Sequence, residues 1–327
     1  MDASDELRAA VAARADASGS APEALAAARA IKALGGDAVA AVLFFGSRQT
    51  HARPDPHSAW DFFVVTRAYA PFYRALRRQG VSRRPPRLLA ALNTVLPPNL
   101  VSLEPGGREG AAVRAKCAVV SLPDLRREAS PRRRDHFIIG RLFQPVTVLY
   151  VDETERKAIL AALVEACRVT EAWARPWLAE RFTVDEYCQT LLRVSYAAEI
   201  RPEPVARRLE TLWAAQRERM RPVYSILLRD LAREGELVET EPGTYGLVHA
   251  PERRERRRLV AYFAWSRVRA TTRWAKHMVT FEGWLDYIVR KAERHTGGPI
   301  ELTPRERRLP LVFLWPRVFR YLRQKDR

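Results

Sequence analysis

The period of the hydrophobic pattern changes near residue 152, and this change constrains the fold more than any other feature of the sequence. Before it, short apolar runs at 38–45 and 59–66 alternate with amphipathic segments, which predicts buried strands interleaved with helices. After it, apolar residues recur at helical spacing in three segments, at 153–178, 183–198 and 203–233. We therefore expect an α+β protein in which a mixed β-sheet domain is followed by a helical domain.

The same pattern divides the chain into five expected parts. These are N-terminal helices at 1–34, the mixed-sheet domain at 35–152, the helical domain at 153–233, a hairpin with further helices at 234–303, and a basic amphipathic tail at 304–327.

The charge balance indicates a class of partner. The chain has 327 residues, with 56 Lys and Arg against 38 Asp and Glu, which gives a net charge of +18. Such a charge attracts nucleotides, nucleic acids and anionic lipids, although a solvated basic surface is an equally good explanation of composition alone.

Cysteine usage and hydropathy indicate a compartment. The three cysteines have no CxxC spacing and no neighbouring histidine cluster, so we expect a reducing, cytoplasmic location without a zinc site. The N-terminal stretch is acidic and alanine-rich, and no long apolar run occurs, so we expect neither a signal peptide nor a membrane-spanning helix.

One turn and one carboxylate are the candidates for chemistry. The apolar run at 38–45 ends in Gly46-Ser47, and the next run carries Asp61. Glycine allows backbone N–H groups to approach a triphosphate, the serine hydroxyl adds a donor, and a carboxylate on the neighbouring strand can hold the magnesium that bridges the phosphates. This layout is that of the nucleotidyltransferase superfamily. Its usual second acid, two positions before Asp61, is replaced by Ala59, so either the site is inactive or another ligand comes from elsewhere in the chain.

Four blocks of sequence, in the same order, resemble the mitochondrial-type phosphatidate cytidylyltransferases, also called the translocator assembly and maintenance family. They are Gly46-Ser47 with Trp60-Asp61-Phe62-Phe63-Val64-Val65, then 116–121, then 136–146, and finally 182–187 with 194–201. That family also lacks an acid at the position of Ala59. The last hundred residues show no match beyond an amphipathic terminal segment.

The resemblance implies a fold, an activity and a set of site residues. The mixed-sheet domain would have the nucleotidyltransferase fold, and the helical domain would complete the active-site cleft. The enzyme would convert CTP and phosphatidic acid to CDP-diacylglycerol and pyrophosphate, with Mg²⁺ as cofactor. The implied residues are Gly46, Ser47, Lys116 and Arg141 for the nucleotide, Asp61 and Glu199 for catalysis and the metal, and Arg201 for the lipid phosphate.

Three positions depart from the family pattern and bear on specificity. Gln144 stands where the family has lysine, Ala198 where it has glycine, and Glu199 where it has aspartate. Triphosphate affinity or acceptor choice can therefore differ from the family, and Glu199 and Arg201 have a surface ion pair as their alternative explanation.

A lipid substrate requires contact with a membrane, and the tail at 304–327 is the candidate for it. The tail combines aromatic and basic residues, with Phe313, Trp315, Arg317, Phe319 and Arg320 as the expected membrane contacts. We expect a cytoplasmic protein, peripheral on the inner face of an anionic membrane. Tail packing against the helical domain is the alternative, and the basic, tryptophan-containing stretch at 265–284 is expected to extend the docking face or to belong to the core.

Two other functions remain open at the level of sequence. A catalytically silent scaffold could keep the fold and bind nucleotide or membrane. A nucleotidyltransferase could also act on another acceptor such as RNA, but the sequence has no recognisable RNA-binding module, so nucleic acid is not the expected partner. The sequence leaves the oligomeric state open.

Overall fold

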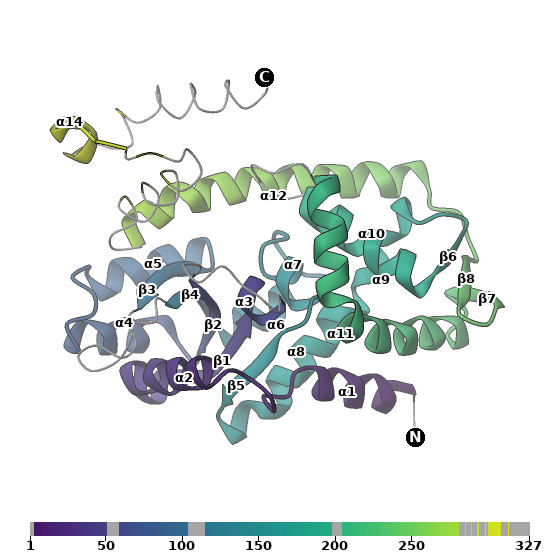
Figure 1. Cartoon of the computed structure of the whole chain (residues 1–327), viewed down its shortest axis with the longest axis horizontal. Helices are drawn as coiled ribbons and strands as arrows, with labels where there is room; N and C mark the ends of the chain where they lie inside the picture. The colour runs from purple at the N-terminus through teal and green to yellow at the C-terminus, as the bar shows by residue number, and fades with distance from the viewer. Residues whose placement is uncertain are drawn as a thin grey trace.

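The computed structural model describes residues 3–50, 59–103, 115–197, 205–280 and 300–308, with the single positions 285, 289, 293, 298 and 313. Its elements confirm the α+β class: a mixed five-stranded sheet is followed by a mostly helical region (Figure 1).

The first part of the chain builds the large sheet and the helices around it. Its strands are β1 (Val39–Phe45), β2 (Trp60–Thr66), β3 (Asn99–Leu103), β4 (Ala115–Ser121) and β5 (Thr147–Val151). Its helices are α1 (Ala3–Arg14), α2 (Pro22–Gly35), the 3-10 turn η1 (Gly36–Ala38), α3 (Ser47–Thr50), α4 (Tyr69–Arg78), α5 (Pro86–Val95), α6 (Leu122–Glu128) and α7 (Ile139–Leu142).

The second part is helical apart from a small sheet. Its helical elements are η2 (Glu153–Glu155), α8 (Arg156–Arg168), α9 (Thr170–Ala174), η3 (Arg175–Trp177), α10 (Val184–Ala197), α11 (Val205–Arg233), α12 (Arg253–Thr280) and α14 (Pro304–Arg308). Its strands are β6 (Arg181–Thr183), β7 (Leu237–Glu241) and β8 (Thr244–Leu247), which pair in the order β6-β8-β7.

The large sheet has the strand order β3-β4-β2-β1-β5. β2 and β4 run parallel, whereas β1 pairs with β2 and β5, and β3 with β4, in antiparallel fashion. β1 and β2 are almost entirely buried, because both faces of the sheet are covered. This explains why each strand is a continuous apolar run rather than an alternating pattern.

Each face of the sheet has its own apolar core. On one face, Phe62 and Val64 of β2 pack in a cluster with residues of α2, α4 and α5. On the other, Phe63 and Val65 pack in a cluster with residues of α1 and of α6 to α11. The second cluster joins the sheet to the helical region, so the apolar core continues across the expected boundary at residue 152.

Two details of the helices differ from the sequence expectation. The helix expected at 153–178 is broken into η2, α8, α9 and η3, and the last break contains Pro176, which lacks the N–H that a helix interior needs. The short helix α6 was not expected at all; its N-terminus is capped by the Ser121 hydroxyl, which accepts a hydrogen bond from the Asp124 amide at 3.3 Å.

Candidate active site

The turn after β1 is built around Gly46 and Asp61. Gly46 has a φ of +89°, a left-handed conformation that side chains other than glycine adopt at a cost. A Cβ atom at Gly46 would also lie 2.8 Å from Oδ2 of Asp61, well inside van der Waals contact. Glycine is therefore required twice, for the backbone and for the close approach of the carboxylate. Ser47 follows as the first residue of α3 and is partly exposed.

The strand register places Lys116 beside Asp61. Asp61 of β2 is paired with Phe45 of β1 on one side and with Lys116 of β4 on the other. Residues paired across parallel strands point to the same face of the sheet, and here Lys116 Nζ lies 3.8 Å from Oδ1 of Asp61. Both side chains remain about one-third exposed, at 34% and 27%. The ion pair is thus loose and partly exposed to solvent.

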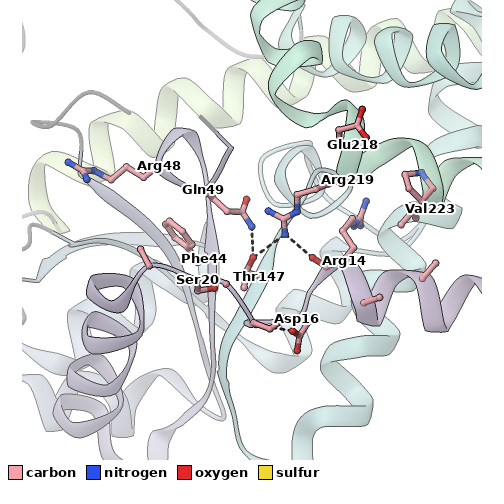
Figure 2. Close-up of a pocket in the computed structure, with 16 residues that line it drawn as sticks. Arg14, Asp16, Ser20, Phe44, Arg48, Gln49, Thr147, Glu218, Arg219 and Val223 are labelled. Atoms are coloured by element: carbon pink, nitrogen blue, oxygen red, sulfur yellow. Dashed lines mark hydrogen bonds between the residues drawn. The ribbon is translucent and has the colours of Figure 1, made fainter. Parts of the chain in front are cut away.

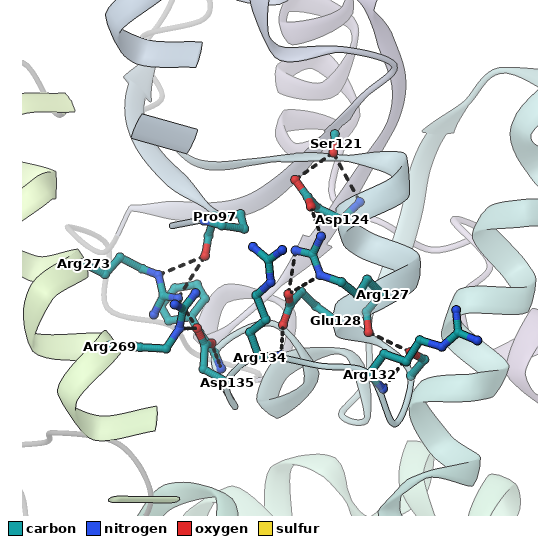
Figure 3. A network of polar contacts seen from close by, with 12 residues as sticks. Pro97, Ser121, Asp124, Arg127, Glu128, Arg132, Arg134, Asp135, Arg269 and Arg273 are labelled. Atoms are coloured by element: carbon teal, nitrogen blue, oxygen red, sulfur yellow. Dashed lines mark hydrogen bonds and ion pairs between the residues drawn. The ribbon is translucent and has the colours of Figure 1, made fainter. Parts of the chain in front are cut away.

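Helix α12 adds a row of basic side chains directed at the sheet domain. Asp135 accepts hydrogen bonds from Arg269 at 2.7 Å and from Arg273 at 2.6 Å, and Arg273 also donates to the Pro97 carbonyl at 2.9 Å (Figure 3). Burial alone would raise the pKa of Asp135, but the two guanidinium groups outweigh it and hold that pKa below its ordinary value. The pairing fixes α12 against the segment that connects α5 to β3.

The next turn of α12 reaches the edge of the site. Lys276 is buried and donates hydrogen bonds to the carbonyls of Leu96 and Pro98. Burial, together with the charge of Arg273, lowers the pKa of Lys276 to about 6. Burial also lowers the pKa of His277 to about 2, with further contributions from the charges of Lys276 and Lys116. His277 is therefore a neutral imidazole at neutral pH. Helix α12 packs on β3, the neighbour of the strand β4 that carries Lys116.

Arg141 lies within the same basic region. Its guanidinium donates to the Phe137 carbonyl at 2.6 Å and lies 3.9 Å from the centre of the Phe137 ring. Arg273 lies over that ring too, at 4.5 Å. Arg141 is thus brought beside the cations of α12.

The third and fourth blocks of the sequence resemblance meet in the interior. The imidazole of His136 lies 3.1 Å from the hydroxyl of Ser195, and both residues are buried. Gly140 packs against them so closely that a Cβ atom there would lie 3.1 Å from each side chain. Because Ser195 is only 1% exposed, the contact positions α7 against α10 and gives no access for a nucleophile.

A cavity of about 550 Å³ lies beside helix α3, which follows Gly46 in sequence (Figure 2). Arg48 and Gln49 of α3 line it together with Arg14 and Arg219, and Arg219 donates to the Thr147 hydroxyl at 3.1 Å. Asp61 is not among the described lining residues, so the cavity adjoins the turn without containing the carboxylate.

The predicted site residues are therefore brought together in part. Gly46, Ser47, Asp61 and Lys116 gather at one end of the strands, and Arg141 lies with α12. Two predicted residues, Glu199 and Arg201, lie outside the described residues, as do Trp315, Arg317, Phe319 and Arg320 of the tail. Phe313 is helical and 42% exposed.

Sequence reasoning did not identify His277, and it left open whether Arg269, Arg273 and Lys276 face a docking surface or the core. The signal was present, because these three basic residues recur at i, i+4 and i+7 on one helical face. Basic residues on a helix are usually solvated, however, and only Asp135, far away in sequence, marks this face as buried.

Among the described residues, Asp61 is the carboxylate that could bind a magnesium ion at this end of the sheet. Asp61 supplies oxygen atoms that are accessible, and no group of three or more His, Cys, Asp or Glu side chains suited to a metal occurs in the part of the chain that the structure describes. Mg²⁺ is commonly held by one or two carboxylates together with substrate phosphates, so Asp61 fits that mode of binding.

Comparison with known proteins gives no family assignment: no protein-family model matches the chain, and no curated protein matches it. Within the described residues, every helix is too short or too polar to cross a bilayer.

Proposed function

We propose that the protein is a nucleotidyltransferase of the phosphatidate cytidylyltransferase type, which forms CDP-diacylglycerol and pyrophosphate from CTP and phosphatidic acid. The observation that carries the proposal is the contact between Gly46 and Asp61, because a left-handed glycine pressed against a strand carboxylate brings a phosphate-binding turn and a metal ligand together. The nearby ammonium of Lys116 supports it by supplying a cation for a phosphate oxygen.

Each residue would have a distinct part in this reaction. Gly46 and Ser47 would contact the triphosphate, Lys116 would neutralise a phosphate oxygen, and Asp61 would hold Mg²⁺, with Glu199 as the proposed second ligand. Bound Mg²⁺ would neutralise the charge that develops on the leaving pyrophosphate. Arg141 and Arg201 are proposed to contact nucleotide and lipid phosphate respectively, since the guanidinium group suits phosphate oxygens.

The proposed chemistry is a single displacement at phosphorus. A phosphate oxygen of phosphatidic acid forms a bond to the α-phosphorus of CTP, while the bond from that phosphorus to the bridging oxygen of pyrophosphate breaks. The attacking oxygen is already anionic, so no strong general base is needed. Alignment and charge neutralisation would supply most of the rate enhancement.

The test is pyrophosphate release together with CDP-diacylglycerol formation by purified protein with CTP, Mg²⁺ and phosphatidic acid vesicles. We expect product with the wild type and none with Asp61→Asn. The matched control is Asp37→Asn, which removes a carboxylate that is fully exposed and should leave the activity unchanged.

Product from Asp61→Asn at the wild-type rate would rule out the assigned metal ligand. No product from the wild type with CTP, ATP, GTP or UTP would reject the proposed activity and favour the silent scaffold. Transfer to RNA but not to phosphatidic acid would favour the other acceptor class.

A further inference from the structure

Helices α4 and α5 form a surface that is basic and free of acidic residues. Residues 62–103 contain no Asp or Glu. The arginines exposed on α4, on α5 and in the loop between them are Arg74, Arg77, Arg78, Arg83, Arg84 and Arg87. In the described part of the chain, no carboxylate pairs with Arg74, Arg77 or Arg78. Within the described residues, the positive charge of Arg74, Arg77 and Arg78 is therefore not neutralised by a carboxylate.

Three of these arginines line one groove. The groove has a volume of about 420 Å³ and is lined by Pro71, Arg74, Arg77, Arg78 and Pro86. The arginines come from successive turns of α4, and the two prolines form its apolar wall. Arg77 already donates one hydrogen bond to the Arg83 carbonyl. Guanidinium groups that line one groove suit a phosphate group, because a guanidinium can donate two parallel hydrogen bonds to its oxygens.

Beside the groove, α5 exposes an apolar stripe. Leu88 is 44% exposed and Val95 is 72% exposed, and Ala91 between them is exposed as well. The spacing i, i+3, i+7 places all three on one side of the helix, while Leu89 and Asn93 are buried on the side that faces the sheet. Leu88 and Val95 thus point to solvent next to the arginines.

We propose that the α4–α5 surface, defined by these arginines with Leu88, Ala91 and Val95, docks the protein on a bilayer of anionic phospholipids. The groove holds a lipid phosphate, and the apolar stripe of α5 enters the boundary between head groups and acyl chains. Basic residues beside exposed aliphatic side chains are the composition of an interfacial membrane contact. The residues of this surface differ from those of the tail at 304–327, for which the sequence predicts a membrane contact.

A lipid fits this surface better than a nucleic acid does. Sequence-tolerant sites for single-stranded nucleic acid combine a basic groove with exposed aromatic rings on which bases stack. The aromatic side chains of the described segment 62–103 are all buried: Phe62, Phe63, Tyr69, Phe72 and Tyr73. Exposed leucine and valine gain nothing from a phosphate backbone, but they lose contact with water when they enter a membrane.

The charge of the groove is tested by co-sedimentation of the full-length protein with vesicles. We expect binding to vesicles that contain phosphatidylglycerol, weakening with salt, and little binding to pure phosphatidylcholine. The triple variant Arg74→Gln, Arg77→Gln, Arg78→Gln should bind the anionic vesicles roughly a hundredfold more weakly. The matched control, Arg8→Gln, Arg29→Gln, Arg181→Gln, removes the same charge from exposed positions on α1, α2 and β6 and should bind like the wild type.

The apolar stripe has its own pair of variants. Leu88→Ser with Val95→Ser should weaken vesicle binding by about tenfold or more, because aliphatic area no longer enters the membrane. The control is Val238→Ser with Val248→Ser, which replaces valines of similar exposure, 48% and 44%, at the β7–β8 hairpin. Figure 1 shows this hairpin at the opposite end of the molecule from α4 and α5.

Three results would overturn the proposal: equal vesicle binding by the triple variant and its control, arginine-dependent binding to an RNA oligonucleotide without vesicle binding, or full displacement from vesicles by millimolar glycerol phosphate. The last would identify a site for a free phosphate compound rather than a bilayer. Circular dichroism of each variant establishes that it is folded. Because vesicle binding needs no catalysis, the docking surface and the proposed transferase activity can fail independently.

Discussion

At Gly46, backbone conformation and side-chain packing set the same requirement for different reasons. The left-handed φ of +89° disfavours any side chain, and the 2.8 Å approach of the Asp61 carboxylate leaves no room for one. The two effects can be separated, because Gly80 has a similar φ of +70° but open space around it.

We predict that Gly80→Ala lowers the free energy of unfolding by about 1–2 kcal/mol, the cost of a left-handed alanine, and that Gly46→Ala lowers it by more, because its Cβ also meets the Asp61 carboxylate. Only Gly46→Ala displaces the Asp61 carboxylate, so only this variant should lower the proposed transferase activity, by roughly a hundredfold. Urea denaturation and pyrophosphate release measure the two effects. Equal activity in both variants would mean that the close approach to Asp61 has no part in the reaction.

Lys276 makes stability depend on pH. Its pKa is about 6 in the folded protein against an ordinary 10.5, so between these pH values the unfolded chain binds a proton that the folded chain does not. The contribution of Lys276 to the free energy of unfolding therefore rises with pH between about 6 and 10.5, and it falls as the pH is lowered towards 6.

We predict that the unfolding free energy of the wild type, relative to Lys276→Met, rises by up to about 1.4 kcal/mol per pH unit between about pH 7 and 9. Urea denaturation at several pH values gives the two curves. Lys157→Met, at an exposed position, serves as the control and should run parallel to the wild type. Parallel curves for Lys276→Met as well would show that Lys276 remains protonated in the folded protein.

At the scale of elements, α12 is held to the sheet domain by buried charge rather than by a large apolar face. Asp135 is the single carboxylate that the described contacts give to both Arg269 and Arg273, and Arg273 is only 1% exposed. Removing one partner of a buried ion pair leaves an uncompensated charge, which costs more than the pair itself contributes.

We therefore predict that Asp135→Asn lowers the free energy of unfolding by about 3–5 kcal/mol and exposes α12 to proteolysis. Asp185→Asn is the matched control, since Asp185 also contacts two arginines, Arg217 at 2.8 Å and Arg221 at 3.4 Å, but is 25% exposed and its two partners are exposed. Its cost should stay below about 1 kcal/mol. Similar losses in both variants would mean that burial does not decide the strength of the Asp135 contacts.

At the scale of the whole molecule, the apolar core does not follow the expected domain division. Leu227 of α11 belongs to the same buried cluster as Phe63 and Val65 of β2, although the change of hydrophobic period near residue 152 lies between them in sequence. The domain boundaries stay a prediction. Because the two parts of the chain share one buried cluster, it can be measured whether they unfold together.

We predict that Leu227→Ala, at a position that is 0% exposed, costs about 2–5 kcal/mol and accelerates hydrogen exchange in β1 and β2 as well as in α11. Val238→Ala, on the exposed side of the hairpin, should leave both regions unchanged. Faster exchange in α11 alone would show that the sheet domain and the helical domain unfold separately.

The sequence by itself determined the strands that can be recognised from a continuous run of apolar residues. β1 and β2 could be predicted because strands covered on both faces must be continuous apolar runs, and the Gly46–Asp61 pair could be predicted because a turn and a strand carboxylate are close in sequence. The charged run at 252–258, by contrast, gave no sign that it begins α12.

Only the tertiary structure decided which face of a helix is buried and which is exposed to solvent. The row of Arg269, Arg273 and Lys276 is indistinguishable in sequence from a solvated basic face, and it is buried because Asp135 and the carbonyls at 96–98 lie opposite. The reverse holds for α5, whose Leu88 and Val95 resemble core residues and are exposed. The partners of α12 come from a distant part of the chain, and the exposed residues of α5 have no partner among the described contacts. The local sequence pattern of a helix contains no information about such distant contacts.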